Sequence, residues 1–99
     1  MSLPRPLIEA FGHFDADFDE SEMSRSITGA GAQLASLPDE ARRDAIAGLR
    51  GLLERVTWPA EDIQALENVT SMIWDPKDPD LRTLLRELLA DVTARGKGA

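Results

Sequence analysis

The sequence predicts an all-α protein, a compact array of about five helices in a single domain. Three observations support this prediction. Apolar residues recur at three- and four-residue steps nearly everywhere, which is the spacing of one helix face. No segment carries a strand signal of comparable strength. The 99 residues can bury one modest core but not two, so we expect one domain over residues 1–99, with a core at about 6–95 and short frayed termini.

A short helix and a longer one are expected in the first third of the chain. The short helix starts after Pro6 and stops at Gly12; its apolar residues are Leu7, Ile8 and Phe11. The longer helix has Ser21 as its expected N-cap, and its apolar face consists of Met23, Ile27, Ala30 and Leu34. Gly29 and Gly31 weaken this helix by ~1 kcal/mol each relative to Ala, so we expect their small size to allow close packing against another helix.

Three more helices are expected in the rest of the chain. The first opens at Leu37-Pro38-Asp39 and ends before Trp58-Pro59; its apolar stripe is Ala41, Ala45, Leu49, Leu52, Leu53 and Val56. The second starts at about Ala60, and its inward residues are Ile63, Leu66, Val69 or Thr70, and Ile73. The third follows a turn at residues 74–79, with Asp78 as its cap and Pro79 at its first position. Its core residues are Leu81, Leu84, Leu85, Leu88 and Val92.

Trp58 and Trp74 each lie at an expected helix end, beside or near a proline. We expect both to close the core, where a large ring buries apolar area and keeps its N–H near water. The alternative is an exposed anchor in a protein interface, where tryptophan is enriched.

Composition restricts the classes of function. The formal charge is −7, from 18 acidic and 11 basic residues, and such a surface disfavours nucleic acid and anionic membranes. No apolar run is long enough for a membrane span or a secretory signal. Cysteine is absent, which favours a reducing compartment, so we expect a cytoplasmic protein. A basic protein partner is the natural complement, and a homo-oligomer is also compatible with this composition.

The negative charge is concentrated in two segments. Residues 1–24 and 60–80 each hold six acids and one base, a net −10 together, while the remainder of the chain carries +3. We predict that carboxylates in these segments bind the partner. The first predicted patch consists of Asp15, Asp17, Asp19, Glu20 and Glu22, and the second of Asp75, Asp78 and Asp80. The alternative interpretation is that both patches only keep a small domain in solution.

Reactive side chains are few, so we expect no enzyme, no cofactor and no metal. His13 is the only histidine, and no Gly-x-Ser-x-Gly string accompanies it, so we expect it to be structural or solvated. The run from Asp15 to Asp19 imitates the start of a calcium loop. However, Glu20 and Ser26 stand where that loop requires Gly and a bidentate Glu. A small metal-using hydrolase built on this acidic run is kept as an alternative function.

Short strings along the chain occur in a characteristic order. Pro6-Leu7-Ile8-Glu9-Ala10-Phe11-Gly12 leads into Phe14-Asp15-Ala16-Asp17-Phe18-Asp19. Leu37-Pro38-Asp39-Glu40-Ala41 opens a long helix that ends in Leu52-Leu53, and Trp74-Asp75-Pro76 precedes the last helix. Over about residues 6–92 this layout resembles the all-helical immunity proteins of contact-dependent growth inhibition systems. Asp15 and Phe18 stand where members of that family tend to have His and Trp.

The resemblance implies a cytoplasmic protein that binds and blocks a toxin domain, commonly a nuclease, without enzyme activity or a cofactor. A nuclease has a basic cleft shaped for phosphates, and an acidic protein is steered towards such a cleft. The alternative is an acidic helical interaction or adaptor module that has no toxin partner, because the same surface identifies no particular target.

Overall fold

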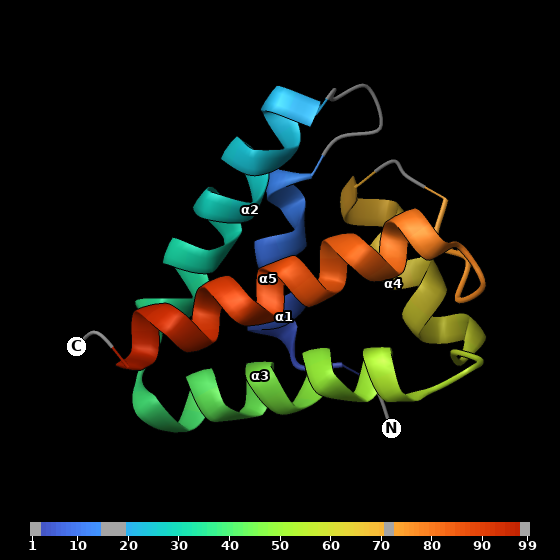
Figure 1. The fold of residues 1–99 in the computed structure, drawn as a ribbon. Helices are drawn as coiled ribbons and strands as arrows, with labels where there is room; N and C mark the ends of the chain where they lie inside the picture. Colours follow the sequence, from blue (N-terminus) through green and yellow to red (C-terminus); the bar gives the residue numbers. More distant parts are fainter. Residues whose placement is uncertain (1–2, 15–19, 71–72, 98–99) are drawn as a thin grey trace.

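The computed structural model describes residues 3–14, 20–70 and 73–97, with the backbone alone for residues 20–23 and 96–97. Within these ranges all regular structure is helical (Figure 1). The elements are α1 (Arg5–Ala10), the 3₁₀ helix η1 (Phe11–His13), α2 (Glu20–Ala35), α3 (Asp39–Glu54), α4 (Ala60–Thr70) and α5 (Pro79–Lys97). The predicted all-α fold of about five helices is therefore confirmed.

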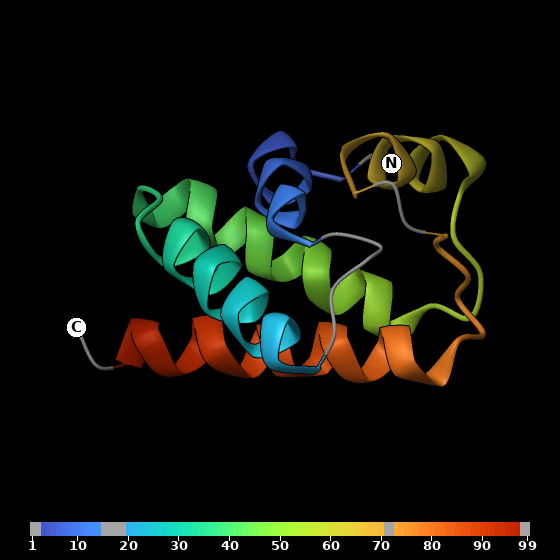
Figure 2. The ribbon, with the colours of Figure 1, turned by 90° about the horizontal axis from the view of Figure 1, so that it is seen from above.

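The helices lie in three levels around one core. α5 runs along one side of the molecule, where it contacts α2 and α3. α1 and α4 lie on the opposite side, and α1 contacts α2, α3 and α4. α2 and α3 therefore lie between α5 and the pair formed by α1 and α4, which Figure 2 shows most clearly.

A single core draws residues from all five α-helices, which confirms one domain. Its apolar members are Leu7, Ala10, Phe11, Phe14, Ile27, Ala30, Leu34, Ala45, Leu49, Leu52, Trp58, Leu66, Trp74, Leu81, Leu84, Leu85, Leu88 and Val92. All five predicted core residues of α5 are among them. Burial of these side chains supplies most of the driving force for folding.

Two predicted core positions are wrong. Val56 is 79% exposed and Ile73 is 83% exposed. α3 ends at Glu54, so Val56 lies beyond the helix and no longer follows its inward register. Ile73 likewise lies outside α4. The sequence left open whether Val69 or Thr70 faces the core. Thr70 is buried and Val69 is 40% exposed, so Thr70 is the inward residue.

The helix starts agree with the sequence at α3, α4 and α5, but not at α1, which begins at Arg5 and not after Pro6, nor at α2. Asp78 caps α5 as predicted, because its Oδ1 accepts the backbone N–H of Asp80 at 3.0 Å and that of Leu81 at 3.5 Å. In contrast, α2 begins at Glu20, so Ser21 lies inside the helix and cannot be its cap.

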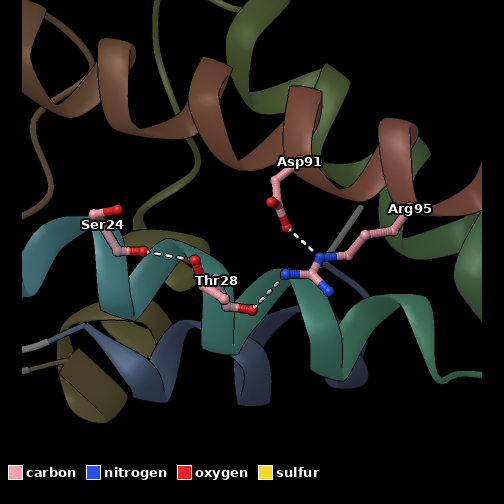
Figure 3. A network of polar contacts seen from close by, with 4 residues as sticks. All are labelled: Ser24, Thr28, Asp91 and Arg95. Atoms are coloured by element: carbon pink, nitrogen blue, oxygen red, sulfur yellow. Dashed lines mark hydrogen bonds and ion pairs between the residues drawn. The ribbon is translucent and has the colours of Figure 1, made fainter.

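Gly31 lies where α2 meets α5, as expected for a residue that allows close packing. A Cβ at this position would lie 1.8 Å from Oδ2 of Asp91. The same carboxylate oxygen pairs with Nε of Arg95 at 2.6 Å, and Nη2 of Arg95 donates to the carbonyl oxygen of Thr28 at 3.4 Å (Figure 3). The Thr28 hydroxyl donates to the carbonyl oxygen of Ser24 at 2.9 Å. A polar network therefore joins the two helices beside the glycine.

Candidate protein-binding surface

An aromatic cluster supports the two links on either side of α4. The ring of Trp74 packs edge-on against Phe11, with centroids 5.0 Å apart and an interplanar angle of 72°. The ring centroids of Trp58 and Trp74 are 6.2 Å apart, and those of Phe11 and Phe14 are 5.8 Å apart. Both tryptophans are buried, which confirms that they close the core and are not exposed anchors. The expectation that their N–H groups lie near water is wrong, because both groups donate to buried acceptors. Trp58 in the α3–α4 link and Trp74 in the α4–α5 link therefore pack in the same aromatic cluster.

Hydrogen bonds fix the orientation of both indole rings. Nε1 of Trp58 donates to the carbonyl oxygen of Leu52 at 3.0 Å. Nε1 of Trp74 donates to the Thr70 hydroxyl at 2.8 Å, and this hydroxyl donates to the carbonyl oxygen of Leu66 at 2.7 Å. Buried polar groups are costly when unpaired, so these bonds favour one arrangement of the rings.

Arg82 connects both links to the end of α3. Its Nη1 donates to the carbonyl oxygen of Leu53 at 2.9 Å, and its Nη2 and Nε donate to the carbonyl oxygens of Arg55 and Pro76. Its guanidinium carbon lies 5.8 Å from the centroid of the Trp58 ring. The last carbonyls of a helix lack intrahelical partners and favour a cation. This role could not be predicted, because nothing in the sequence distinguishes Arg82 from the other arginines.

Residues 73–80, called the 73–80 segment below, are held in place from several sides. The backbone N–H of Trp74 donates to Oε2 of Glu67 at 3.2 Å. Oδ1 of Asp75 accepts the N–H of Lys77 at 2.9 Å, and the carbonyl oxygen of Asp75 accepts the N–H of Asp78 at 3.0 Å. Together with the Asp78 cap and the Arg82 contact at Pro76, these bonds give the segment a defined conformation.

Three of the eight predicted partner-binding residues lie on this segment. Asp75 and Asp80 are exposed, and Asp78 is half-buried because its carboxylate caps α5. Within the described part of the chain, none of the three forms an ion pair. They therefore present negative charge to solvent, with two of the carboxylates also holding the local backbone.

The other five predicted residues are only partly placed. Asp15, Asp17 and Asp19 lie outside the described residues. The backbone of Glu20 and Glu22 belongs to the first turns of α2, while their side chains lie outside the description. The start of α2 and the 73–80 segment lie apart in both views (Figures 1 and 2). The structure therefore does not bring Glu20 and Glu22 together with the second patch.

Ile73 is the feature of this surface that sequence analysis missed. It precedes the buried Trp74 and exposes 83% of its own area next to the exposed Asp75. A large apolar side chain gains ~1.5–3 kcal/mol when it is fully buried, so its transfer to a partner would be favourable. The helical spacing from Ile63 predicted that Ile73 faces the core. Because α4 ends at Thr70, Ile73 lies outside the helix and is exposed.

Asp62 belongs to the acidic segment 60–80 but does not contribute to its surface. It is 2% exposed, and its Oδ1 accepts the backbone N–H of Leu3 at 3.3 Å. Its Oδ2 has no hydrogen-bond partner among the described residues. The side chain therefore holds the N-terminal segment against α4 and is not available to a partner.

The acidic run from Asp15 to Asp19, on which the metal-using hydrolase alternative depends, lies outside the described residues, so that alternative stays a prediction. Elsewhere, no group of three or more described His, Cys, Asp or Glu residues lies close enough to hold a metal ion. Nε2 of His13 lies 2.7 Å from Oε1 of Gln33, and a Cβ on Gly29 would lie 2.8 Å from its Nδ1. His13 therefore joins η1 to α2, which agrees with the expected structural role.

A comparison of the chain with protein-family models, curated proteins and solved structures finds no match. The resemblance to immunity proteins therefore stays a prediction based on short sequence strings. Across the described ranges, no helix has both the length and the apolar character that a membrane span requires.

Proposed function

We propose that this protein neutralises a toxin by binding a basic toxin domain, such as a nuclease, through the 73–80 segment. The observation that carries the proposal is the exposed side chain of Ile73 beside exposed carboxylates, on a segment that buried contacts hold in place. The proposal includes a cytoplasmic location and no catalytic activity, metal or cofactor of its own.

The fixed conformation of the segment supports this role. Trp74 anchors it in the aromatic cluster, Arg82 holds the carbonyl oxygen of Pro76, and Asp78 caps α5. A surface that is already ordered loses little conformational entropy when it binds, so more of the contact energy appears as affinity.

The charge of the protein supports a basic target. With a net charge of −7, the protein attracts a positive cleft over several ångströms and repels nucleic acid. Asp75 and Asp80 can occupy phosphate positions in such a cleft, while Ile73 supplies apolar contact that a phosphate chain does not offer. Asp15, Asp17, Asp19, Glu20 and Glu22 remain the proposed second patch.

Direct binding tests the proposal. The partner to use is the C-terminal domain of a large secreted toxin whose gene lies directly upstream of the gene for this protein. We expect a stable 1:1 complex in calorimetry and survival of cells that express both chains. If no complex forms and the protein gives no protection, the proposal is wrong. If the protein does not protect cells from the toxin domain but binds another basic protein through the same segment, the adaptor alternative is favoured.

Charge-matched variants locate the interface. Asp75→Asn/Asp80→Asn removes two charges from the segment and keeps an acceptor oxygen for the N–H of Lys77. Asp39→Asn/Glu40→Gln removes two charges from the first turn of α3, at the far end of that helix from the segment (Figure 1). We expect about tenfold weaker binding for the first pair and little change for the second. Equal effects would show that only net charge matters.

A further inference from the structure

A groove of about 420 Å³ runs along α3 beside the N-terminal segment. Its lining residues are Leu3, Pro4, Asp44, Ala47, Gly48, Gly51, Leu52 and Arg55. A Cβ on Gly48 would lie 2.9 Å from Cδ of Pro4, so Pro4 packs on the helix backbone and forms one wall. A Cβ on Gly51 would meet no atom within 4 Å, so the floor of the groove is open there.

Opposite charges lie at the two ends of this groove. Asp44 and Arg55 are both exposed, and neither forms an ion pair with another described residue. They are 11 positions apart, which is about 16 Å along a helix. The midpoint between them falls between Gly48, which Pro4 of the same chain covers, and Gly51, where the absence of a side chain leaves room for another chain to approach.

This arrangement is complementary to itself. If a second α3 crosses the first in the antiparallel sense, a two-fold axis can pass through the midpoint of the groove. Asp44 then faces Arg55 of the partner subunit, and Arg55 faces Asp44 of the partner subunit. Such an interface is isologous, because both copies use the same surface.

We propose that the α3 groove is the interface of a symmetric dimer and that its occupant is the same groove of a second copy. Gly51 leaves room for close contact near the centre, and Leu3 and Pro4 add apolar area beside it. Two exposed ion pairs contribute at most about 1 kcal/mol each, so the dimer is weak, with a dissociation constant on the order of 100 μM. This inference does not rest on the proposed function, because the 73–80 segment lies outside the groove.

Charge exchange tests the dimer by sedimentation equilibrium between about 10 μM and 1 mM protein. Asp44→Arg and Arg55→Asp each place like charges at both ends of the interface and weaken the dimer about tenfold. The double variant Asp44→Arg/Arg55→Asp restores the wild-type affinity, and so does a 1:1 mixture of the two single variants. Arg43→Asp, an exposed change on α3 outside the groove lining, leaves the dimer intact.

A cross-link gives an independent test, because the chain contains no cysteine. Gly51 lies next to the proposed axis, so Gly51→Cys forms an intersubunit disulfide under mild oxidation. Ala94→Cys, exposed on α5 and outside this groove, stays monomeric under the same conditions. A wild-type protein that is monomeric throughout the concentration range, a double exchange that fails to restore the dimer, or equal cross-linking of both cysteine variants overturns the proposal.

Discussion

Replacing Arg82 with alanine removes three hydrogen bonds that one side chain donates to the end of α3 and to the α4–α5 link. Hydrogen bonds from a charged group contribute about 1.5–3 kcal/mol each, and a cation over an aromatic ring adds about 0.5–1 kcal/mol. Arg82 is half-buried, so water reaches some of the released carbonyl groups and compensates for part of the loss. We therefore expect Arg82→Ala to lower the free energy of unfolding by about 3 kcal/mol. For a domain of this size that corresponds to a fall in Tm of about 12–24 °C.

Urea unfolding followed by tryptophan fluorescence measures this effect, with an unchanged m-value as the sign of a pure stability change. Arg86→Ala is the matched control on the same helix. Nη2 of Arg86 donates only to the Thr83 hydroxyl, at 3.2 Å on the exposed surface, so its loss costs about 0.5 kcal/mol or less. Arg82→Lys keeps the charge but not the planar fork, so it lies between the two. Equal midpoints for Arg82→Ala and Arg86→Ala would refute the role given to the Arg82 network.

The remaining predictions concern packing, one buried hydrogen bond and salt. Gly31→Ala lowers the free energy of unfolding by up to about 2 kcal/mol in urea titrations, because its Cβ would lie 1.8 Å from Oδ2 of Asp91 and displace that carboxylate from Arg95, which outweighs the ~1 kcal/mol that alanine gains over glycine in a helix. Gly12→Ala, whose Cβ would meet nothing within 4 Å, is neutral or stabilising by up to about 1 kcal/mol. Thr70→Val removes the hydroxyl that accepts the buried indole N–H of Trp74. This lowers the free energy of unfolding by about 1–3 kcal/mol and alters the near-UV circular dichroism. Association with a basic partner slows as salt rises, which stopped-flow fluorescence can follow.

The helices and their apolar faces follow from the sequence because their signals are local. The repeat of leucines in α5 places one face in the core whatever surrounds it, and Asp78 before Pro79 marks the helix start by chemistry that acts within three residues. The prediction that Gly31 allows close packing also holds, since a helix tolerates a glycine best where another helix needs the room.

The ends of α3 and α4 depend on tertiary contacts and could not be derived from periodicity. The apolar spacing continued to Val56 and Ile73, yet both residues lie beyond the helices and are exposed. The carbonyl groups at the end of α3 are taken by Arg82, from a helix 27–29 residues later in the chain. A sequence shows that an arginine is present but not which carbonyls it will meet.

The candidate surface could be predicted in part. Composition located the acidic turn and its three carboxylates, and it did not show that Asp62 in the same segment would be buried. The exposure of Ile73, on which the proposed interface depends, comes from where α4 ends and from Trp74 taking the inward position.

Substitution of Ile73 tests the central claim most directly. The measurement is calorimetric titration of the upstream-encoded toxin domain with wild-type protein and with Ile73→Ser, which changes an exposed side chain and leaves the aromatic cluster unaltered. We predict 1:1 binding by the wild type, and for the variant an affinity lower by about 10- to 100-fold at unchanged thermal stability. Equal affinities for the two proteins, or no binding by the wild type, would contradict the assignment of the 73–80 segment as the binding surface.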